Sequence, residues 1–427
     1  MLLKWARVCR EAYEDRFGGF RFMLTVKTPG EVLELVQQLP LQKTNVEQVP
    51  LCSALGRVLG ETIHASEYVP NFNRSTVDGY AVRGSDTFGC SDSIPAVLSL
   101  TGAVKMGRET NLTVQTGTCV AVPTGGEIPD GADAVVMEEY TEDYGDGTIG
   151  ILKSASPGAN VVYRGDDVFP GKTILQAGRR ITAPDIGALA AIGMEEVPVA
   201  VQPRVGIIST GDELVEVGQN PGPGQVRDVN SSLMAAAVES FGGQAVHYGI
   251  LKDEEALLRE TVALAAEECD CVLISGGSSV GKKDVTCQIL NNLGTLLFHG
   301  IAMKPGKPTI MAMIGDKPVM GLPGHPCAAF FAAHLFVRPM LWKMMGQPFA
   351  VRCVEAVLTE TVSANHGRAQ YTGVHLIPGE RGLNAVPIHS KSGLISSLAG
   401  SDGYFEIPRN CEGLAAGSRI AVTVYQI

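Results

Sequence analysis

The sequence of 427 residues is long enough for roughly two to four domains and a large buried core. Its hydrophobic content of 45% and charged content of 19% are those of soluble globular proteins. The formal net charge of -11 argues against nucleic acid as the main partner, because binding to nucleic acid requires basic residues that neutralise phosphates. An anionic ligand would therefore need a local cluster of basic side chains.

Targeting signals and disulfide patterns are missing from the sequence. No apolar run reaches the roughly 18 residues of a membrane span, and residues 1–22 lack the apolar core of a signal peptide. The ten cysteines are scattered, without a C-x-x-C pair. This usage favours reduced thiols. We therefore expect a cytoplasmic protein without a membrane partner.

The N-terminal part of the chain predicts a domain interrupted by an insertion. Residues 1–22 are interpreted either as an extension or as a consequence of the choice of start codon, and a helix opened by Pro29 follows them. Apolar helical patterns over Val49–Leu59 and Pro184–Ala191 flank a region rich in Gly, Thr and Val. Each pattern is too short to bury its apolar face alone. We predict a discontinuous elongated domain over 23–69 and 163–202, with an inserted all-β module over 70–162.

The second half of the chain predicts two further domains. Strands alternate with helices over 203–346, which indicates a three-layer α/β domain. After Gln347 the pattern is strand-like again and predicts a small C-terminal β-barrel over 347–427. The strands expected in the α/β domain are Val205–Ser209, Ala245–Ile250, Val272–Ser275, Leu296–Phe298, Thr309–Met313 and Lys317–Met320.

A glycine-rich loop between a strand and a helix is the first candidate site. It follows the apolar strand Cys271–Ile274 and continues to Asp284. Glycines allow the backbone N–H groups to approach a ligand closely, and the next helix offers its positive N-terminal end to an anion. Asp284 is available for a cation. An ordinary connecting loop is the alternative, because one Gly-rich motif is weak evidence. The anion-binding positions expected here are Gly276, Gly277, Ser278, Ser279 and Gly281.

Carboxylates and lysines at neighbouring strand ends extend this candidate site. Asp212 and Glu213 follow the strand ending at Ser209, where open α/β sheets place their ligands. Lys304 and Lys307 lie in a proline-stiffened segment. Carboxylates suit magnesium, whereas lysines and amide N–H groups suit an oxyanion. The sequence therefore predicts a site for a metal-bound anionic substrate.

Simpler roles and a rival chemistry remain open for several of these residues. Asp253 is a good helix N-cap before Glu254, and Asp78 before a glycine is a plausible turn residue. Gly277–Gly281 also fits the G-x-S-x-G pattern of a serine hydrolase with Ser279 as the nucleophile. Asp316 and His325 follow it in hydrolase order, but this interpretation leaves the two lysines unexplained.

Several motifs occur together and in a fixed order. They are Ser75–Ala81, Thr124–Gly125, Pro129–Val136, Arg164–Asp167, Thr210–Leu214, Gly276–Asp284, Lys304–Pro308 and Gly321–Gly324. In combination they resemble the molybdopterin molybdenumtransferases, the MoeA and gephyrin E-domain family, from Met23 to the end of the chain. The chain departs from the family pattern at Val77, Asp166 and His325, where methionine, glutamate and asparagine are usual. The histidine either changes the preference between molybdate and tungstate or preserves a hydrogen bond.

The resemblance implies the last step of molybdenum cofactor synthesis. Family members cleave the adenylyl bond of adenylylated molybdopterin with a divalent cation such as Mg²⁺, insert molybdenum from molybdate and release AMP. It also implies a homodimer and contact with the molybdopterin adenylyltransferase. A non-catalytic, gephyrin-like scaffold is the alternative. By carry-over, the metal positions are Asp212, Glu213, Asp253 and Asp284, the anion and loop positions Lys304, Lys307, Pro323 and Pro326, and further functional positions Asp78, Thr124 and Asp167.

Overall fold

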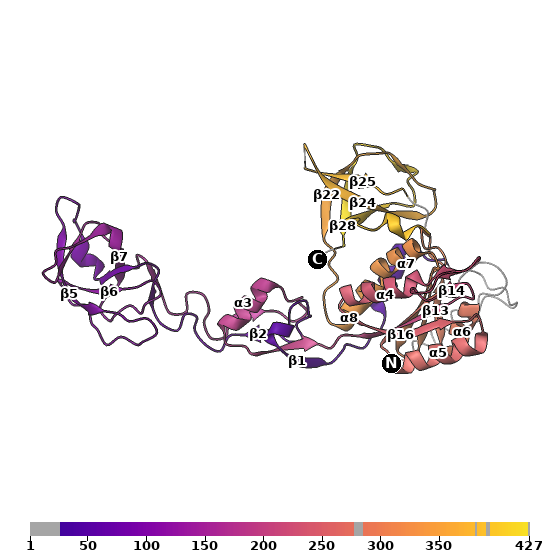
Figure 1. The fold of residues 1–427 in the computed structure, drawn as a ribbon, viewed down its shortest axis with the longest axis horizontal. Helices are drawn as coiled ribbons and strands as arrows, with labels where there is room; N and C mark the ends of the chain where they lie inside the picture. The colour runs from indigo at the N-terminus through magenta and orange to yellow at the C-terminus, as the bar shows by residue number, and fades with distance from the viewer. Residues whose placement is uncertain (1–25, 277–284, 381, 390–392, 426–427) are drawn as a thin grey trace. The chain divides into compact units, whose positions relative to one another are not determined.

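The computed structural model describes residues 26–276, 285–380, 382–389 and 393–425 (Figure 1). The expected extension over 1–22 lies outside these residues. The chain divides into two compact units. One contains the described residues up to Glu47 and from Ala200 onward, and the other is Gln48–Val199.

The α/β domain of the first unit is built on a six-stranded sheet. Its four neighbouring strands β16, β13, β17 and β21 are parallel, and β20 and β18 continue the sheet with antiparallel pairs. The central strand β17 is buried along its whole length, as expected for a parallel strand covered on both faces. The strands in sheet order are β16 (Gln244–Leu251), β13 (Arg204–Thr210), β17 (Cys271–Ser275), β21 (Lys317–Leu322), β20 (Ile310–Ile314) and β18 (Thr295–His299).

Helices cover both faces of this sheet and confirm the predicted three layers. The chain moves from β13 to β16 in one direction and from β16 to β17 in the other, so right-handed crossovers place α4 and α5 on opposite faces. Figure 1 shows α4 and α7 on one side of the strands and α5 and α6 on the other. Their bounds are α4 (Val229–Ser240), α5 (Glu255–Glu268), α6 (Val285–Leu293) and α7 (Pro326–Ala332), which continues through a π-helical turn (Ala333–Val337) into α8 (Arg338–Met344).

The predicted N-terminal helix α2 (Pro29–Gln38) is present and packs against α8. Thr28 and Glu31 form a capping box at its start. At its end, Nζ of Lys343 donates hydrogen bonds to the carbonyl oxygens of Val36 (3.3 Å), Gln37 and Leu39 (2.6 Å). These bonds satisfy terminal carbonyls that have no partner within the helix.

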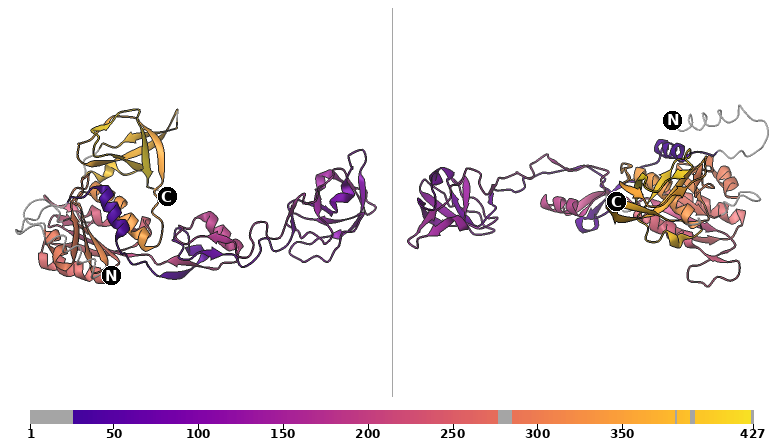
Figure 2. Two further views of the ribbon diagram at one scale, coloured as in Figure 1. Left: turned by 180° about the vertical axis from the view of Figure 1, so that it is seen from behind. Right: turned by 90° about the horizontal axis from the view of Figure 1, so that it is seen from above.

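The C-terminal region is the expected β-barrel, and Figure 2 shows it from two further sides. Five strands close on themselves in the order β24, β25, β22, β28, β26, with β26 pairing back to β24. The short strand β19 (Met303–Lys304) of the α/β domain adds to β24 in parallel. Sequence patterns missed β26. The barrel strands are β22 (Cys353–Leu358), β24 (Ala369–Gly379), β25 (Gly382–Pro387), β26 (Gly403–Ile407) and β28 (Arg419–Val424), and a small pair joins β23 (Val362–Ser363) to β27 (Gly413–Leu414).

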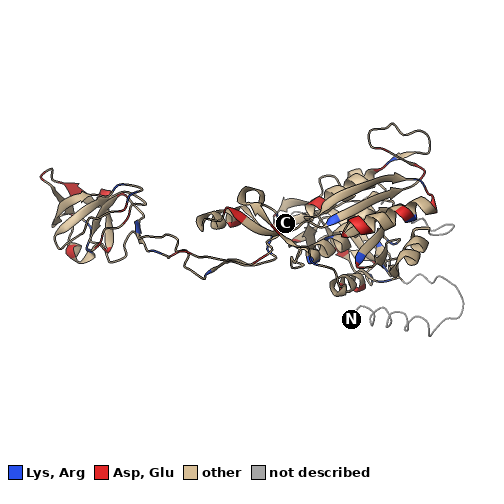
Figure 3. Ribbon diagram, turned by 90° about the horizontal axis from the view of Figure 1, so that it is seen from below, with Lys and Arg blue, Asp and Glu red and all other residues tan. Residues whose placement is uncertain are grey.

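The second unit contains a β module with a six-stranded sheet. Successive residues of β4 enter different apolar clusters, Ala81 one and Val82 the other, so both faces of the sheet are buried. On the face shown in Figure 3, acidic and basic residues are interspersed over the ribbon. The strands in sheet order are β7 (Ala134–Met137), β4 (Gly79–Val82), β6 (Thr118–Val122), β5 (Ala96–Ala103), β9 (Thr148–Ile151) and β8 (Thr141–Asp143), with single 3-10 turns at Gly84–Thr87 and Glu138–Tyr140.

The remainder of this unit joins chain segments from both sides of the β module. Leu59, Val168 and Leu189 lie in one apolar cluster. The helix α3 (Ala183–Ala191) matches the sequence pattern, but the helix expected over Val49–Leu59 is wrong. Backbone N–H groups there pair with the distant second segment, so only one 3-10 turn forms. The strands are β1 (Val46–Pro50) with β12 (Glu196–Ala200), β2 (Ile63–His64) with β11 (Thr173–Leu175), and β3 (Arg74–Ser75) with β10 (Val161–Val162).

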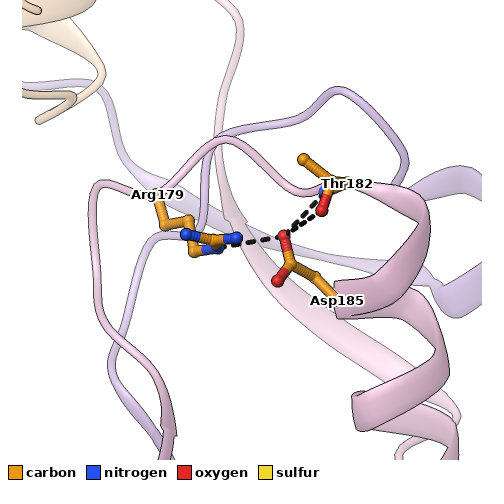
Figure 4. Close-up of polar contacts among 3 residues, drawn as sticks. All are labelled: Arg179, Thr182 and Asp185. Atoms are coloured by element: carbon orange, nitrogen blue, oxygen red, sulfur yellow. Dashed lines mark hydrogen bonds and ion pairs between the residues drawn. The ribbon is translucent and has the colours of Figure 1, made fainter.

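A buried carboxylate fixes the start of α3 (Figure 4). Oδ2 of Asp185 accepts hydrogen bonds from Nε of Arg179 (2.9 Å) and from the backbone N (2.8 Å) and Oγ1 (2.7 Å) of Thr182. Burial by itself raises the pKa of this carboxyl. The bonds from Arg179 and Thr182 outweigh burial, so the pKa of Asp185 lies below its ordinary value.

Candidate active site

The carboxyl ends of three parallel strands meet at one edge of the α/β sheet. Ser209 pairs with Ser275 and Ser275 with Leu322, so the segments that follow β13, β17 and β21 lie side by side. Gly276 has a φ of +106°, and a Cβ at this position would overlap the carbonyl oxygen of Thr210. Only glycine therefore fits at the start of the loop after β17.

Two of the predicted carboxylates are brought together at this edge. The hydroxyl of Thr210 donates a hydrogen bond of 2.7 Å to Oδ1 of Asp253, and the backbone N of Asp253 donates one of 3.3 Å to Oδ1 of Asp212. The N-cap interpretation of Asp253 is wrong. Glu254 occupies the cap position of α5, and no side-chain cap bond forms there. Asp253 instead faces Thr210 because Thr210 pairs with Leu251 in the sheet.

A cavity of about 1340 Å³ opens from this edge toward the β-barrel within the first unit. Every predicted anion-binding position that the structure describes lines this cavity. The barrel contributes Arg368, Gln370, Tyr371 and His389 to its wall. Sequence patterns missed these four residues, because nothing local to the barrel sequence indicates which side faces the α/β domain. The predicted positions that line the cavity are Glu213, Gly276, Lys304, Lys307, Pro323 and Pro326.

The backbone that carries the two lysines is held at both ends. Lys304 pairs with Gln370 in the β19–β24 ladder. Beyond Lys304, Oγ1 of Thr309 donates a hydrogen bond of 2.7 Å to the carbonyl oxygen of Gly306. The backbone N of Ile301 donates a hydrogen bond of 2.9 Å to the carbonyl oxygen of Lys307. Both lysine side chains are exposed, and both line the cavity. Two exposed ammonium groups on a fixed backbone suit an oxyanion.

Asn230 is a cavity residue that sequence reasoning did not identify. It is the second residue of α4 and is buried. Its Nδ2 donates to Ser275 Oγ (2.7 Å) and to the carbonyl oxygen of Gly324 (2.9 Å). An asparagine at a helix start is usually interpreted as a local cap, so only the fold distinguishes this role.

Three predicted positions belong to the second unit. The backbone N of Thr124 donates a hydrogen bond of 2.9 Å to Oδ1 of Asp78, because β4 and β6 pair through Gly79 and Val122. Asp78 lines a hollow of about 290 Å³ in the β module. Asp167 is exposed in another segment, where its backbone N donates to the carbonyl of Val69 (3.1 Å).

The proposed metal site is only partly described. Gly277, Ser278, Ser279, Gly281 and Asp284 lie outside the described residues. Within the described ranges, no group of three or more His, Cys, Asp or Glu side chains is arranged to hold a metal ion. Asp212 and Asp253, which are joined by the hydrogen bond from the Asp253 backbone, nevertheless carry the oxygen donors that Mg²⁺ prefers.

The serine-hydrolase triad is wrong. Asp316 precedes the first residue of β21, and His325 follows its last residue. A strand of this length separates them by about 20 Å, at opposite edges of the sheet. These two side chains cannot assist one nucleophile.

Two further expectations concern thiols and membranes. No disulfide joins the cysteines that the structure describes. Within the described part of the chain, every helix is too short or too polar to cross a bilayer.

The fold and cavity define a class of protein in which an α/β domain and a β-barrel form opposite walls of a cavity at the sheet edge. Family models match three consecutive parts of the chain. Residues 27–193 match the MoeA N-terminal region (domain I and II), residues 206–343 a probable molybdopterin binding domain, and residues 355–425 the MoeA C-terminal region (domain IV).

Individual relatives cover nearly the whole chain. The molybdopterin molybdenumtransferase of Bacillus subtilis is 33% identical over 94% of this chain and 95% of its own length. A putative molybdopterin biosynthesis protein of Methanocaldococcus jannaschii is 32% identical over 92% and 95%. The crystal structure of a molybdopterin biosynthesis MoeA protein from Pyrococcus horikoshii is 35% identical, covers 94% of this chain and 100% of that one, and has a TM-score of 0.84. The chain belongs to the MoeA family of molybdopterin molybdenumtransferases.

Proposed function

We propose that the protein inserts molybdenum from molybdate into adenylylated molybdopterin and releases AMP. The observation that carries this proposal is the cavity between the sheet edge and the barrel, with Lys304 and Lys307 on a fixed backbone and the carboxylates of Asp212 and Asp253 at the same sheet edge. Relatives that align with 94% and 88% of this chain are named molybdopterin molybdenumtransferase.

The lysines would bind molybdate. An ion pair at 4 Å is worth about 4 kcal/mol at an effective dielectric constant of 20. Two such lysines can therefore concentrate a dianion despite the net charge of -11. The pterin and its phosphate would occupy the rest of the cavity, with the phosphate at the N–H groups of the loop that begins at Gly276.

Asp212, Glu213, Asp253 and Asp284 would hold the divalent cation, which we infer to be Mg²⁺. When bound, such an ion polarises the phosphoryl oxygens of the adenylyl bond and favours its cleavage. Within the chain, Thr210 fixes the orientation of the Asp253 carboxylate through its 2.7 Å hydrogen bond. The exposed carboxylates of Asp212 and Glu213 remain available as ligands.

The remaining assignments rest on the family resemblance. We infer that Asp78, Thr124 and Asp167 contribute to the reaction, that the protein is a cytoplasmic homodimer, and that it receives its substrate from the molybdopterin adenylyltransferase. Light scattering on a size-exclusion column tests the dimer. A mass of one chain, 45.1 kDa, would contradict it.

A direct assay tests the proposed reaction. Purified protein, adenylylated molybdopterin, molybdate and Mg²⁺ should yield AMP together with molybdenum bound to the dithiolene. Omitting Mg²⁺ should suppress AMP release. Binding of the adenylylated substrate without any AMP release under these conditions would instead support the non-catalytic scaffold.

A further inference from the structure

The side chain of Asn230 joins the end of β17 to the segment that follows β21. Ser275 and Leu322 are the last paired residues of β17 and β21. The next residues, Gly276 after β17 and Pro323 and Gly324 after β21, line the cavity. A Cβ on Gly324 would lie 4.0 Å from the Cα of Gly276, so the backbone at these two positions approaches closely.

Asn230 supplies hydrogen bonds at the position where the ladder ends. Its Nδ2 donates to Ser275 Oγ (2.7 Å), to the carbonyl oxygen of Gly324 (2.9 Å) and, at 3.5 Å, to that of Pro323. Carbonyl oxygens only accept hydrogen bonds, so the NH₂ group and not the amide oxygen must face them. The orientation of this amide is therefore fixed.

The burial of Asn230 indicates that this arrangement is specific. The residue is 6% exposed. Its Oδ1 is buried and has no hydrogen-bond partner in the structure. A buried acceptor without a partner is unfavourable, so a residue chosen only for stability would be apolar here. An apolar residue could not replace the N–H donors of the amide that bind Ser275 and Gly324.

We propose that Asn230 is a positioning residue that holds the backbone of Gly324 beside the end of β17 and so shapes this part of the cavity wall for the anionic part of the substrate. It acts through Ser275 and Gly324 and does not need to touch the substrate. This inference rests on the proposed function of the cavity. It extends that function by assigning substrate affinity to a residue outside the lysine and carboxylate positions.

The substitution N230D tests the proposal because its effect depends on pH. The introduced carboxylate has the shape of the amide but cannot donate to the carbonyl of Gly324. When protonated, it can donate one bond. Burial raises the pKa of such a carboxyl, which brings this protonation within an accessible range. Lowering the pH should therefore restore one donated hydrogen bond in N230D, whereas the wild-type amide should not respond to pH.

We expect KM for adenylylated molybdopterin to rise about tenfold in N230D at pH 8, the factor that corresponds to about 1.4 kcal/mol. At pH 5.5 the ratio of variant to wild-type KM should return toward one. N292D is the matched control, because Asn292 is exposed on α6. Its KM should equal that of the wild type at both pH values. S275A removes one of the acceptors and should give a smaller, pH-independent rise.

Hydrogen exchange supplies a readout that does not depend on turnover. Peptides covering 271–276 and 321–326 should exchange faster in N230D than in N292D at pH 8, and equally at pH 5.5. The proposal is overturned if KM and exchange in N230D match the control at pH 8, or if exchange rises over the whole sheet at both pH values. If the wild type releases no AMP but N230D still exchanges faster than N292D at pH 8, the proposed reaction is rejected. The positioning role of Asn230 is then still supported.

Discussion

The hydroxyl of Thr210 donates a 2.7 Å hydrogen bond to Oδ1 of Asp253, although 43 positions separate them in the chain. The bond exists because β13 and β16 pair in parallel, with Thr210 opposite Leu251. Thr210, at the end of β13, thus orients the carboxylate of Asp253, which follows β16. The backbone N of Asp253 in turn donates a hydrogen bond of 3.3 Å to Oδ1 of Asp212.

Removing this hydroxyl should weaken metal binding. T210V keeps the shape of the side chain but leaves Asp253 without its donor, whereas T210S keeps the donor. Loss of one hydrogen bond to a charged group costs about 1.5–3 kcal/mol, less where the carboxylate is exposed. We expect T210V to need roughly tenfold more Mg²⁺ for half-maximal AMP release. The prediction is wrong if T210V and T210S have the same Mg²⁺ dependence.

The two cavity lysines should govern the response to molybdate. In K304A/K307A, the molybdate concentration for half-maximal insertion should rise by at least about tenfold, since two ion pairs are lost. The double variant K105A/K153A lowers the net charge equally in the other unit. Equal molybdate dependence of the two double variants would show that only total charge matters.

His334 should make the protein less stable in mild acid. It lies among aromatic rings, with Phe330 at 4.3 Å and Phe241 at 4.9 Å between ring centroids. Burial, with the nearby charge of Arg338, lowers its pKa to about 3. The unfolded chain takes up a proton near the ordinary pKa of about 6.5, whereas the folded chain does not. Above pH 6.5 this residue therefore does not lower the free energy of unfolding. As the pH falls from about 6.5 toward 3, proton uptake by the unfolded chain lowers it progressively.

The size of this effect can be measured by urea unfolding. Between pH 6.5 and pH 5 the free energy of unfolding should fall by about 1.6 kcal/mol more in the wild type than in H334F. H366F, at an exposed position, is the control and should follow the wild type. Parallel pH profiles of wild type and H334F would show that the ring is not neutral and buried.

Protonation of Asp185 should also lower the free energy of unfolding as the pH falls, but at a lower pH than for His334. Because its folded pKa is lowered, its contribution is present above the ordinary pKa of about 3.9 and is lost as the pH falls through the folded value. At pH 7, D185N should lower the free energy of unfolding by about 1–2 kcal/mol, a value reduced because Arg179 is half exposed. Calorimetry should show this difference shrinking below pH 3.5. D92N, in an exposed turn, should be neutral at both pH values.

The sequence by itself determined the local elements and the chemistry of the loops. Short apolar runs predicted the strands of the α/β domain, and Gly276, Asp212 and the two lysines were identifiable because their backbone or charge requirements are local. The helix over Val49–Leu59 failed because hydrogen bonds to a distant segment replaced those within a helix.

Tertiary structure alone decided which side chains share the cavity. Arg368 and Tyr371 reach it because β19 adds to β24, a pairing between segments more than 60 residues apart. Asp253 and Asn230 carry ordinary helix-start signals in the sequence, and only strand order turns them toward Thr210 and Ser275. The physical reason is that propensity and periodicity act over a few residues, whereas register between distant strands depends on the packing of the whole core.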